Sequence, residues 1–184
     1  MVHVPWARDL ARQLLAEPLP RRWAHAQGVG RRAESVAHIV GADSDLLICA
    51  AWLHDIGYTP ALAATGFHPL DGARYLRDAE AADPTLCRLV AHHTCAVIEA
   101  RRRGLREELL AEFPPVDGPT ADALLYCDMT TSPDGDLVDV ETRLDEIAER
   151  YSAGSVVYES IKEARSQILR ATNCVRRKLE SSPS

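Results

Sequence analysis

The stretch DSDLLICAAWLHDIG, residues 43–57, is apolar on every side of the helix that it predicts. A helix without a polar face must be surrounded by other parts of the chain, so this segment marks the centre of a helical bundle. Cap-type residues begin it, and Gly57 and Pro60 end it. His54 and Asp55 lie at the end of this segment. Their polar, metal-capable side chains need an explanation, because the pattern before them predicts a buried core.

The rest of the chain repeats Ala, Leu, Arg and Glu with helical spacing and has almost no alternating strand pattern. We therefore predict an all-α fold, a compact multi-helix bundle. Prolines, glycines and cap-type residues place the limits of the other helices. These are expected at about 4–16, 20–40, 68–79, 83–104, 121–131, 137–150 and 155–179.

The length of 184 residues suits one domain, 1–184, and we find no repeat and no linker. With a net charge of −6, the chain has no overall positive potential that would attract the phosphate backbone of a nucleic acid, so nucleic acid is not an expected partner. No basic start precedes an apolar run, and no uninterrupted apolar run has membrane length, so no membrane association and a cytoplasmic location are expected. The oligomeric state, a homo-oligomer included, stays open.

Five cysteines are an odd number and contain no CxxC pair. They fall mostly inside apolar helical patterns, which predicts buried, reduced thiols.

Seven residues with metal-ligand chemistry lie on or beside the predicted apolar helices. They are His25, His54, Asp55, His68, His92, His93 and Asp128. A buried imidazole or carboxylate without a partner is costly, so several of them inside one bundle need a common compensating charge. A single such His is more often a hydrogen-bonded core residue and a single Asp more often a cap, but the ordered set favours a metal site. Nitrogen and oxygen ligands suit iron, manganese, cobalt, zinc or magnesium.

The order His25, His54-Asp55, Asp128 resembles the HD-domain superfamily of metal-dependent phosphohydrolases. The sequence segments around these residues, RRWAHAQGVGRRA, WLHDIG and LLYCDMTT, are also similar to motifs of that superfamily. The core motifs cover about 20–132. The helices at about 137–179 are then expected to be ordinary amphipathic covers.

The resemblance implies that His25, His54, Asp55 and Asp128 hold one divalent metal. "FHPLDGARYL" and "VAHHT" are similar to segments that supply a second ion in binuclear members. His68 and one or both of His92 and His93 would be the additional ligands. Asp55 would bridge the two ions and is the candidate catalytic carboxylate. Adjacent helical residues point about 100° apart, so His92 and His93 need not reach the same ion.

The chemistry that the resemblance implies is hydrolysis of a small phosphorylated substrate, a phosphate ester or nucleotide, by a metal-activated water. Arg22 and Arg74 are candidate substrate-binding residues. The chain lacks the DGxGYP segment of cyclic dinucleotide phosphodiesterases, and Tyr58 or Thr59 stands where several hydrolytic subfamilies carry Lys. Two alternatives stay open: a binuclear-iron oxygenase of the same superfamily, and a non-catalytic metal-binding module.

Overall fold

The computed structural model describes residues 2–181, and the regular secondary structure of this part of the chain is helical apart from one isolated bridge between Thr131 and Leu137. The predicted all-α class is therefore confirmed. The α-helices are α1 Val4–Leu15, α2 Pro20–Val36, α3 Ser44–Leu53, α4 His68–Asp78, α5 Pro84–His92, α6 Ala96–Arg103, α7 Arg106–Glu112, α8 Pro119–Met129, α9 Val140–Arg150 and α10 Val156–Ser181. Short 3₁₀ turns, η1 Ala37–Asp43, η2 Ile56–Tyr58 and η3 His93–Cys95, interrupt the series.

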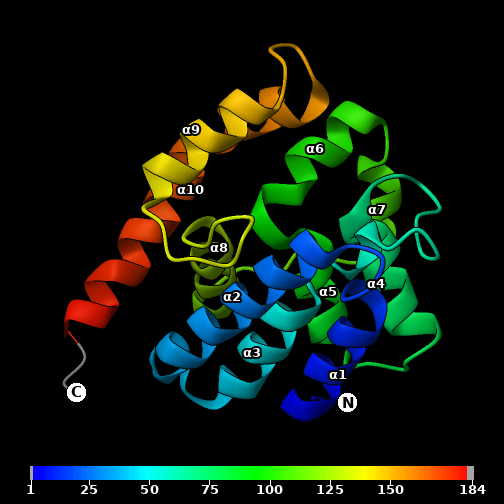
Figure 1. The fold of residues 1–184 in the computed structure, drawn as a ribbon, viewed down its shortest axis with the longest axis horizontal. Helices are drawn as coiled ribbons and strands as arrows, with labels where there is room; N and C mark the ends of the chain where they lie inside the picture. The colour runs from blue at the N-terminus through cyan, green and yellow to red at the C-terminus, as the bar shows by residue number, and fades with distance from the viewer. Residues whose placement is uncertain (1, 182–184) are drawn as a thin grey trace.

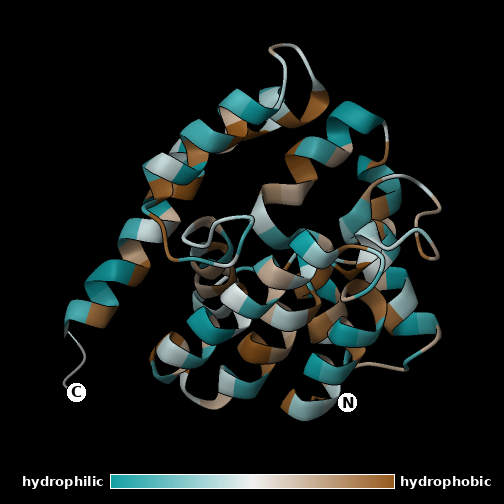
Figure 2. Cartoon of the chain, in the orientation of Figure 1, coloured by the Kyte–Doolittle hydropathy of each residue, from teal (hydrophilic) through white to brown (hydrophobic). Residues whose placement is uncertain are grey.

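Helix α3 lies in the middle of the bundle, as its sequence predicts. Residues 47–53 are all buried, and α1, α2, α5 and α8 pack around this helix. Helices α9 and α10 run side by side along one flank of the bundle (Figure 1), with α10 packed on α8. The polar faces of α9 and α10 point outward (Figure 2), while Leu144 and Ile168 join a second apolar cluster with Met129 of α8.

The helix limits differ from the prediction where the backbone has to change direction. The segment predicted as one helix over 83–104 is two helices, α5 and α6, joined by η3. Thr94 and Cys95 take left-handed conformations there, with φ of 47° and 61°. Residues with a side chain rarely adopt such a conformation, and composition gives no sign of it. The short helix α7 was not predicted.

The helix predicted over 20–40 ends earlier, at Val36, and continues as the η1 turn. Gly41 has φ of 61° there and redirects the chain into α3. Asp83 caps α5 as expected, since its carboxylate accepts hydrogen bonds from the amides of Thr85 and Leu86.

One stretch of the described residues, Pro20–Tyr58, is long and apolar enough to satisfy a length-and-hydropathy criterion for a membrane span. This stretch is not one straight helix, because it contains α2, η1, α3 and η2. The central helix of a bundle meets the same criterion, so the observation is weak evidence for a membrane.

Candidate metal centre

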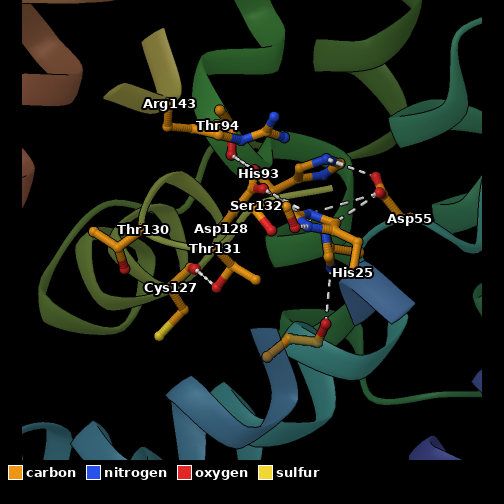
Figure 3. Close-up of polar contacts among 12 residues, drawn as sticks. His25, Asp55, His93, Thr94, Cys127, Asp128, Thr130, Thr131, Ser132 and Arg143 are labelled. Carbon is orange, nitrogen blue, oxygen red and sulfur yellow. Dashed lines mark hydrogen bonds and ion pairs between the residues drawn. The ribbon is translucent and has the colours of Figure 1, made fainter. Parts of the chain in front are cut away.

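Six of the seven candidate ligands converge from five segments, in two adjacent groups of three. In each group the potential ligand atoms lie within 4.8 Å of one another. The groups are His25, His54 and Asp128, and Asp55, His68 and His93. Figure 3 shows several of these side chains pointing toward one another.

Asp55 lies between the two groups and presents a different oxygen to each. Its Oδ2 is 3.5 Å from Nε2 of His54 and 4.0 Å from Nε2 of His25. Its Oδ1 is 3.3 Å from Nε2 of His68 and 3.9 Å from Nε2 of His93. This arrangement is the one that a carboxylate needs to bridge two cations.

Three of the histidines are oriented by the main chain. Nδ1 of His25 lies 2.9 Å from the carbonyl of Ser132, Nδ1 of His54 lies 2.8 Å from that of Ala51, and Nδ1 of His93 lies 2.7 Å from that of Val90. A carbonyl only accepts hydrogen bonds, so each Nδ1 carries a proton and donates it. A neutral imidazole then has a free lone pair on Nε2, the atom that faces the other group members.

The environment of His54 supports a cation at this place. Its Nε2 is buried and has no hydrogen-bond partner among the described residues. The nearest charged atoms are the carboxylate oxygens of Asp55 and Asp128, at 3.5 and 3.9 Å. A lone pair that faces two carboxylates is unfavourable unless a proton or a metal ion lies between them. The donor set of nitrogens and oxygens fits a divalent transition metal or magnesium.

The two carboxylates are kept ionised although both are buried. Burial opposes ionisation of Asp55, but His54 and Arg22 hold its pKa well below the usual range. Burial likewise opposes ionisation of Asp128, but His25, whose Nε2 lies 3.0 Å from Oδ1 of Asp128, and His54 lower its pKa. Burial also lowers the pKa of His68 to about 3 and that of His93 below its ordinary value. Anionic carboxylates and neutral imidazoles are the forms that bind metal.

The carbonyl that orients His25 depends on a glycine in α2. The turn after α8 folds back over α2, and a Cβ on Gly28 would lie 2.5 Å from the carbonyl oxygen of Gly135. Arg21 fixes the same turn from outside through an ion pair with Asp134 at 2.9 Å. Only a residue without a side chain lets this turn approach, and this approach brings the Ser132 carbonyl to His25.

The left-handed turn η3 separates the two adjacent histidines. His93 points into the second group and is 7% exposed, whereas His92 turns away and its Nε2 lies 2.6 Å from the carbonyl of Phe113. The structure does not bring His92 to either group. Thr94 follows His93 in the same turn, and its hydroxyl donates to Oδ2 of Asp128.

Of the two arginines predicted to bind substrate, the structure brings only Arg22 to the centre. Its Nη1 lies 2.8 Å from Oδ2 of Asp55, and its guanidinium lies 3.9 Å from the ring centre of Tyr58. Tyr58 in turn stacks on His68 at 3.8 Å. Arg74 faces away and binds Glu112 and Glu108 instead, because α4 points it toward α7.

A cavity of about 80 Å³ opens beside the two groups. Asp55, His68, His93 and Asp128 line its inner end, and side chains from α9 and α10 form the opposite wall. Sequence patterns did not indicate this wall, because its residues lie in an ordinary amphipathic pattern. The wall includes Arg143, Arg150, Tyr151, Val157 and Ile161.

The family model described as HD domain matches residues 22–154 of the chain. This range includes all the candidate ligands and extends past the expected core motifs through α9. Comparison with curated proteins found no match, and comparison with solved structures found none either.

Proposed function

The chain belongs to the HD-domain family, and on this premise we propose that it is a metal-dependent phosphohydrolase whose nucleophile is water. The substrate class is a phosphate ester or nucleotide. One observation carries the proposal: three imidazoles donate from Nδ1 to main-chain carbonyls and turn Nε2 toward two ionised carboxylates. When bound, two divalent ions would lower the pKa of a water and offset negative charge on a phosphoryl oxygen.

The residues of the chain have separate roles in this proposal. His25, His54 and Asp128 would hold one ion, and His68 and His93 would hold the other. Asp55 serves both groups, because its two oxygens already face them separately. This bridging role is why we assign it as the catalytic carboxylate.

Arg22 and Thr94 position the carboxylates rather than react. Arg22 holds Oδ2 of Asp55, and the Thr94 hydroxyl holds Oδ2 of Asp128. A guanidinium beside Asp55 also lies at the cavity, where it can contact a substrate oxygen. The aromatic ring of Tyr58 is sandwiched between Arg22 and His68 and restricts both side chains.

The adjacent pair His92 and His93 provides a matched test. Protein purified without chelator is analysed for metal and assayed on a panel of nucleotides, phosphomonoesters and phosphodiesters. We expect two ions per chain, and we expect His93→Gln to lose about half of the metal and to lower kcat at least about 100-fold. His92→Gln removes an equally large imidazole one position away and should retain both ions and activity.

Several outcomes would contradict the proposal. Full activity in Asp55→Ala would remove the basis for the site, since this variant should lose metal and activity while its helical spectrum persists. Two irons with an oxygen-sensitive optical spectrum and no phosphate release would point to the oxygenase. Bound metal with neither reaction would leave a non-catalytic module.

The cellular setting belongs to the same proposal. We propose a small phosphorylated molecule as the partner and the cytoplasm as the compartment. A homo-oligomer is compatible with the proposal, and the six converging ligands come from one chain.

A further inference from the structure

Arg143 of α9 is buried, with 5% of its surface exposed, and lies far along the chain from every predicted ligand. Its Nη1 donates to Glu146, one turn further along the same helix. Its Nε is buried and has no hydrogen-bond partner among the described residues. A buried guanidinium N–H without an acceptor is unfavourable, so the position calls for an acceptor that the chain itself does not supply.

The side chain is directed into the cavity of the candidate metal centre. Arg143 lines the cavity together with Thr94, Asp128 and His93. Figure 3 shows it reaching from α9 above Thr94, on the side opposite His25. An acceptor that reaches Nε of Arg143 would therefore lie between α9 and the two ligand groups.

The two arginines that α9 contributes to the cavity lining, Arg143 and Arg150, share one carboxylate. Glu146 accepts from Arg143 and also pairs with Arg150, whose Nε is 3.3 Å away, so one carboxylate serves two guanidinium groups. Glu99, which lines the cavity, is paired with Arg103 at 2.7 Å. Arg143 and Arg150 can therefore attract an anion once the proposed metal ions offset the charges of Asp55 and Asp128 in the same cavity.

We propose that Arg143 is a specificity-determining residue that binds a terminal phosphoryl group of the substrate from the side opposite the metal ligands. A guanidinium can donate two parallel N–H bonds to two oxygens of one phosphate, and Nε is one of the donors in that fork. This inference rests on the proposed function for the identity of the anion. It assigns a binding role to α9, which the amphipathic pattern alone describes as a cover.

The apolar side of the same wall suggests how the remainder of the substrate is accommodated. Val157 and Ile161 of α10 line the cavity beside Tyr151. A phosphoryl group held between Arg143 and the ligand groups would direct an ester's organic group toward these side chains. The substrate class is then a phosphate ester with an apolar or aromatic group.

The test measures binding of inorganic phosphate to the metal-loaded protein by calorimetry, alongside the metal content. Arg143→Gln should weaken phosphate binding about tenfold or more, the loss expected for a charge-assisted hydrogen bond, with metal content unchanged. Arg143→Lys keeps the charge but loses the fork and should also weaken binding. Arg106→Gln, which removes an exposed arginine paired with the adjacent Glu107, is the control and should bind as the wild type does.

Glu146→Gln separates a binding role of Arg143 from a structural one. If Arg143 binds phosphate, removal of the competing carboxylate should strengthen phosphate binding. If Arg143 only stabilises α9 through Glu146, both Glu146→Gln and Arg143→Gln should lower the melting temperature and leave phosphate affinity unchanged, which would overturn the inference. Arg143→Lys keeps the test decisive should Arg143→Gln fail to fold.

Failure of this inference differs from failure of the proposed function. Hydrolysis with wild-type KM and phosphate affinity in the Arg143 variants would keep the phosphohydrolase and reject the role of Arg143. Phosphate binding that depends on Arg143, without hydrolysis of any ester, would keep the anion site and reject the phosphohydrolase. A wild-type protein that binds no phosphate would overturn the inference directly.

Discussion

At the residue scale, His54 differs from an ordinary buried histidine because only one of its two ring nitrogens has a hydrogen-bond partner among the described residues. His25, His54 and His93 each satisfy Nδ1 with a main-chain carbonyl. An ordinary core histidine would satisfy both nitrogens within the protein, whereas Nε2 of His54 is left without a partner among the described residues. The orientation thus follows from the helix ends and turns that supply those carbonyls.

The cysteines allow a test of burial by chemical reactivity. Burial raises the pKa of the Cys49, Cys87 and Cys95 thiols to about 11 and that of Cys127 to about 12. These thiols are protonated at pH 8 and become thiolates only as the pH rises toward those values, so they should resist alkylation in the native protein. Cys174 is only partly buried.

Peptide mapping after iodoacetamide treatment at pH 8 should therefore find Cys174 modified first. All five thiols should react once the protein is unfolded in denaturant. Fast native-state labelling of Cys127 would contradict the packing of α8.

The sequence singled out ionisable side chains that the structure brings together, and it gave no sign of the groups that orient them. His25, His54, Asp55 and Asp128 could be found because ionisable residues are unusual inside apolar helical patterns. The carbonyl of Ser132 could not be found, since main-chain groups leave no mark in composition. Arg143 was also missed, because an arginine in an amphipathic helix is normally solvated.

At the element scale, two turns determine which side chains reach the centre. The break at η3 separates His92 from His93, and a continuous helix would have separated them only by the ordinary 100°. Left-handed backbone at a threonine and a cysteine costs energy and persists where the surrounding structure imposes it. Helical periodicity predicted one helix over 83–104, because no glycine or proline occurs at the break.

The second of these turns is the one after α8, which carries the Ser132 carbonyl to His25. Gly28 and Gly30 of α2 provide a matched pair of positions for testing it. In Gly28→Ala the new Cβ would meet Gly135 and Thr131, and in Gly30→Ala it would meet the Trp52 ring, each at about 2.5 Å. Both variants should lose about 1–3 kcal/mol from overpacking, partly offset by the better helix propensity of alanine. Urea denaturation measures this loss.

Metal affinity should distinguish the two variants. Gly28→Ala displaces the turn that holds the Ser132 carbonyl against His25, so its metal affinity should fall. Gly30→Ala disturbs only the packing of α2 on α3 and should bind metal nearly as tightly as the wild type. Equal affinities in the two variants would show that the turn does not orient His25.

At the scale of the whole molecule, the bundle places its charged centre at the end of its buried central helix. The central helix α3 ends at Leu53, and the next two residues are His54 and Asp55. Helices α2, α4 and α8 contribute candidate ligands around this end, and α5 contributes one through the turn that follows it. The fold is thus stabilised by apolar packing and carries a cluster of buried carboxylates that a cation would stabilise.

Removal of metal should lower the stability of the protein without changing its helix content. A ligand at 100 times its dissociation constant stabilises the native state by about 2.7 kcal/mol. In a domain of this size, that corresponds to a melting temperature about 5–10 °C higher than in the chelated protein. Circular dichroism should show the same helical signal with and without chelator, because apolar packing and main-chain hydrogen bonds maintain the bundle.

Restoration of the original melting temperature by added metal is the control for this measurement. A chelated protein that melts at the same temperature would contradict a metal site in the core. Loss of the helical signal on chelation would mean that the ligand geometry forms only around the ion.

The hydrogen bonds from the three histidines to main-chain carbonyls also affect how such a chain can change over evolutionary time. The backbone sets the ligand directions, so residues on the cavity wall can be exchanged without redirecting the imidazoles. In the proposed phosphohydrolase, substitutions at Arg143, Tyr151 or Ile161 would thus alter which molecules are accepted while the ligand geometry is preserved. Diversification toward new substrates is therefore most accessible through α9 and α10, the elements whose sequences look least specialised.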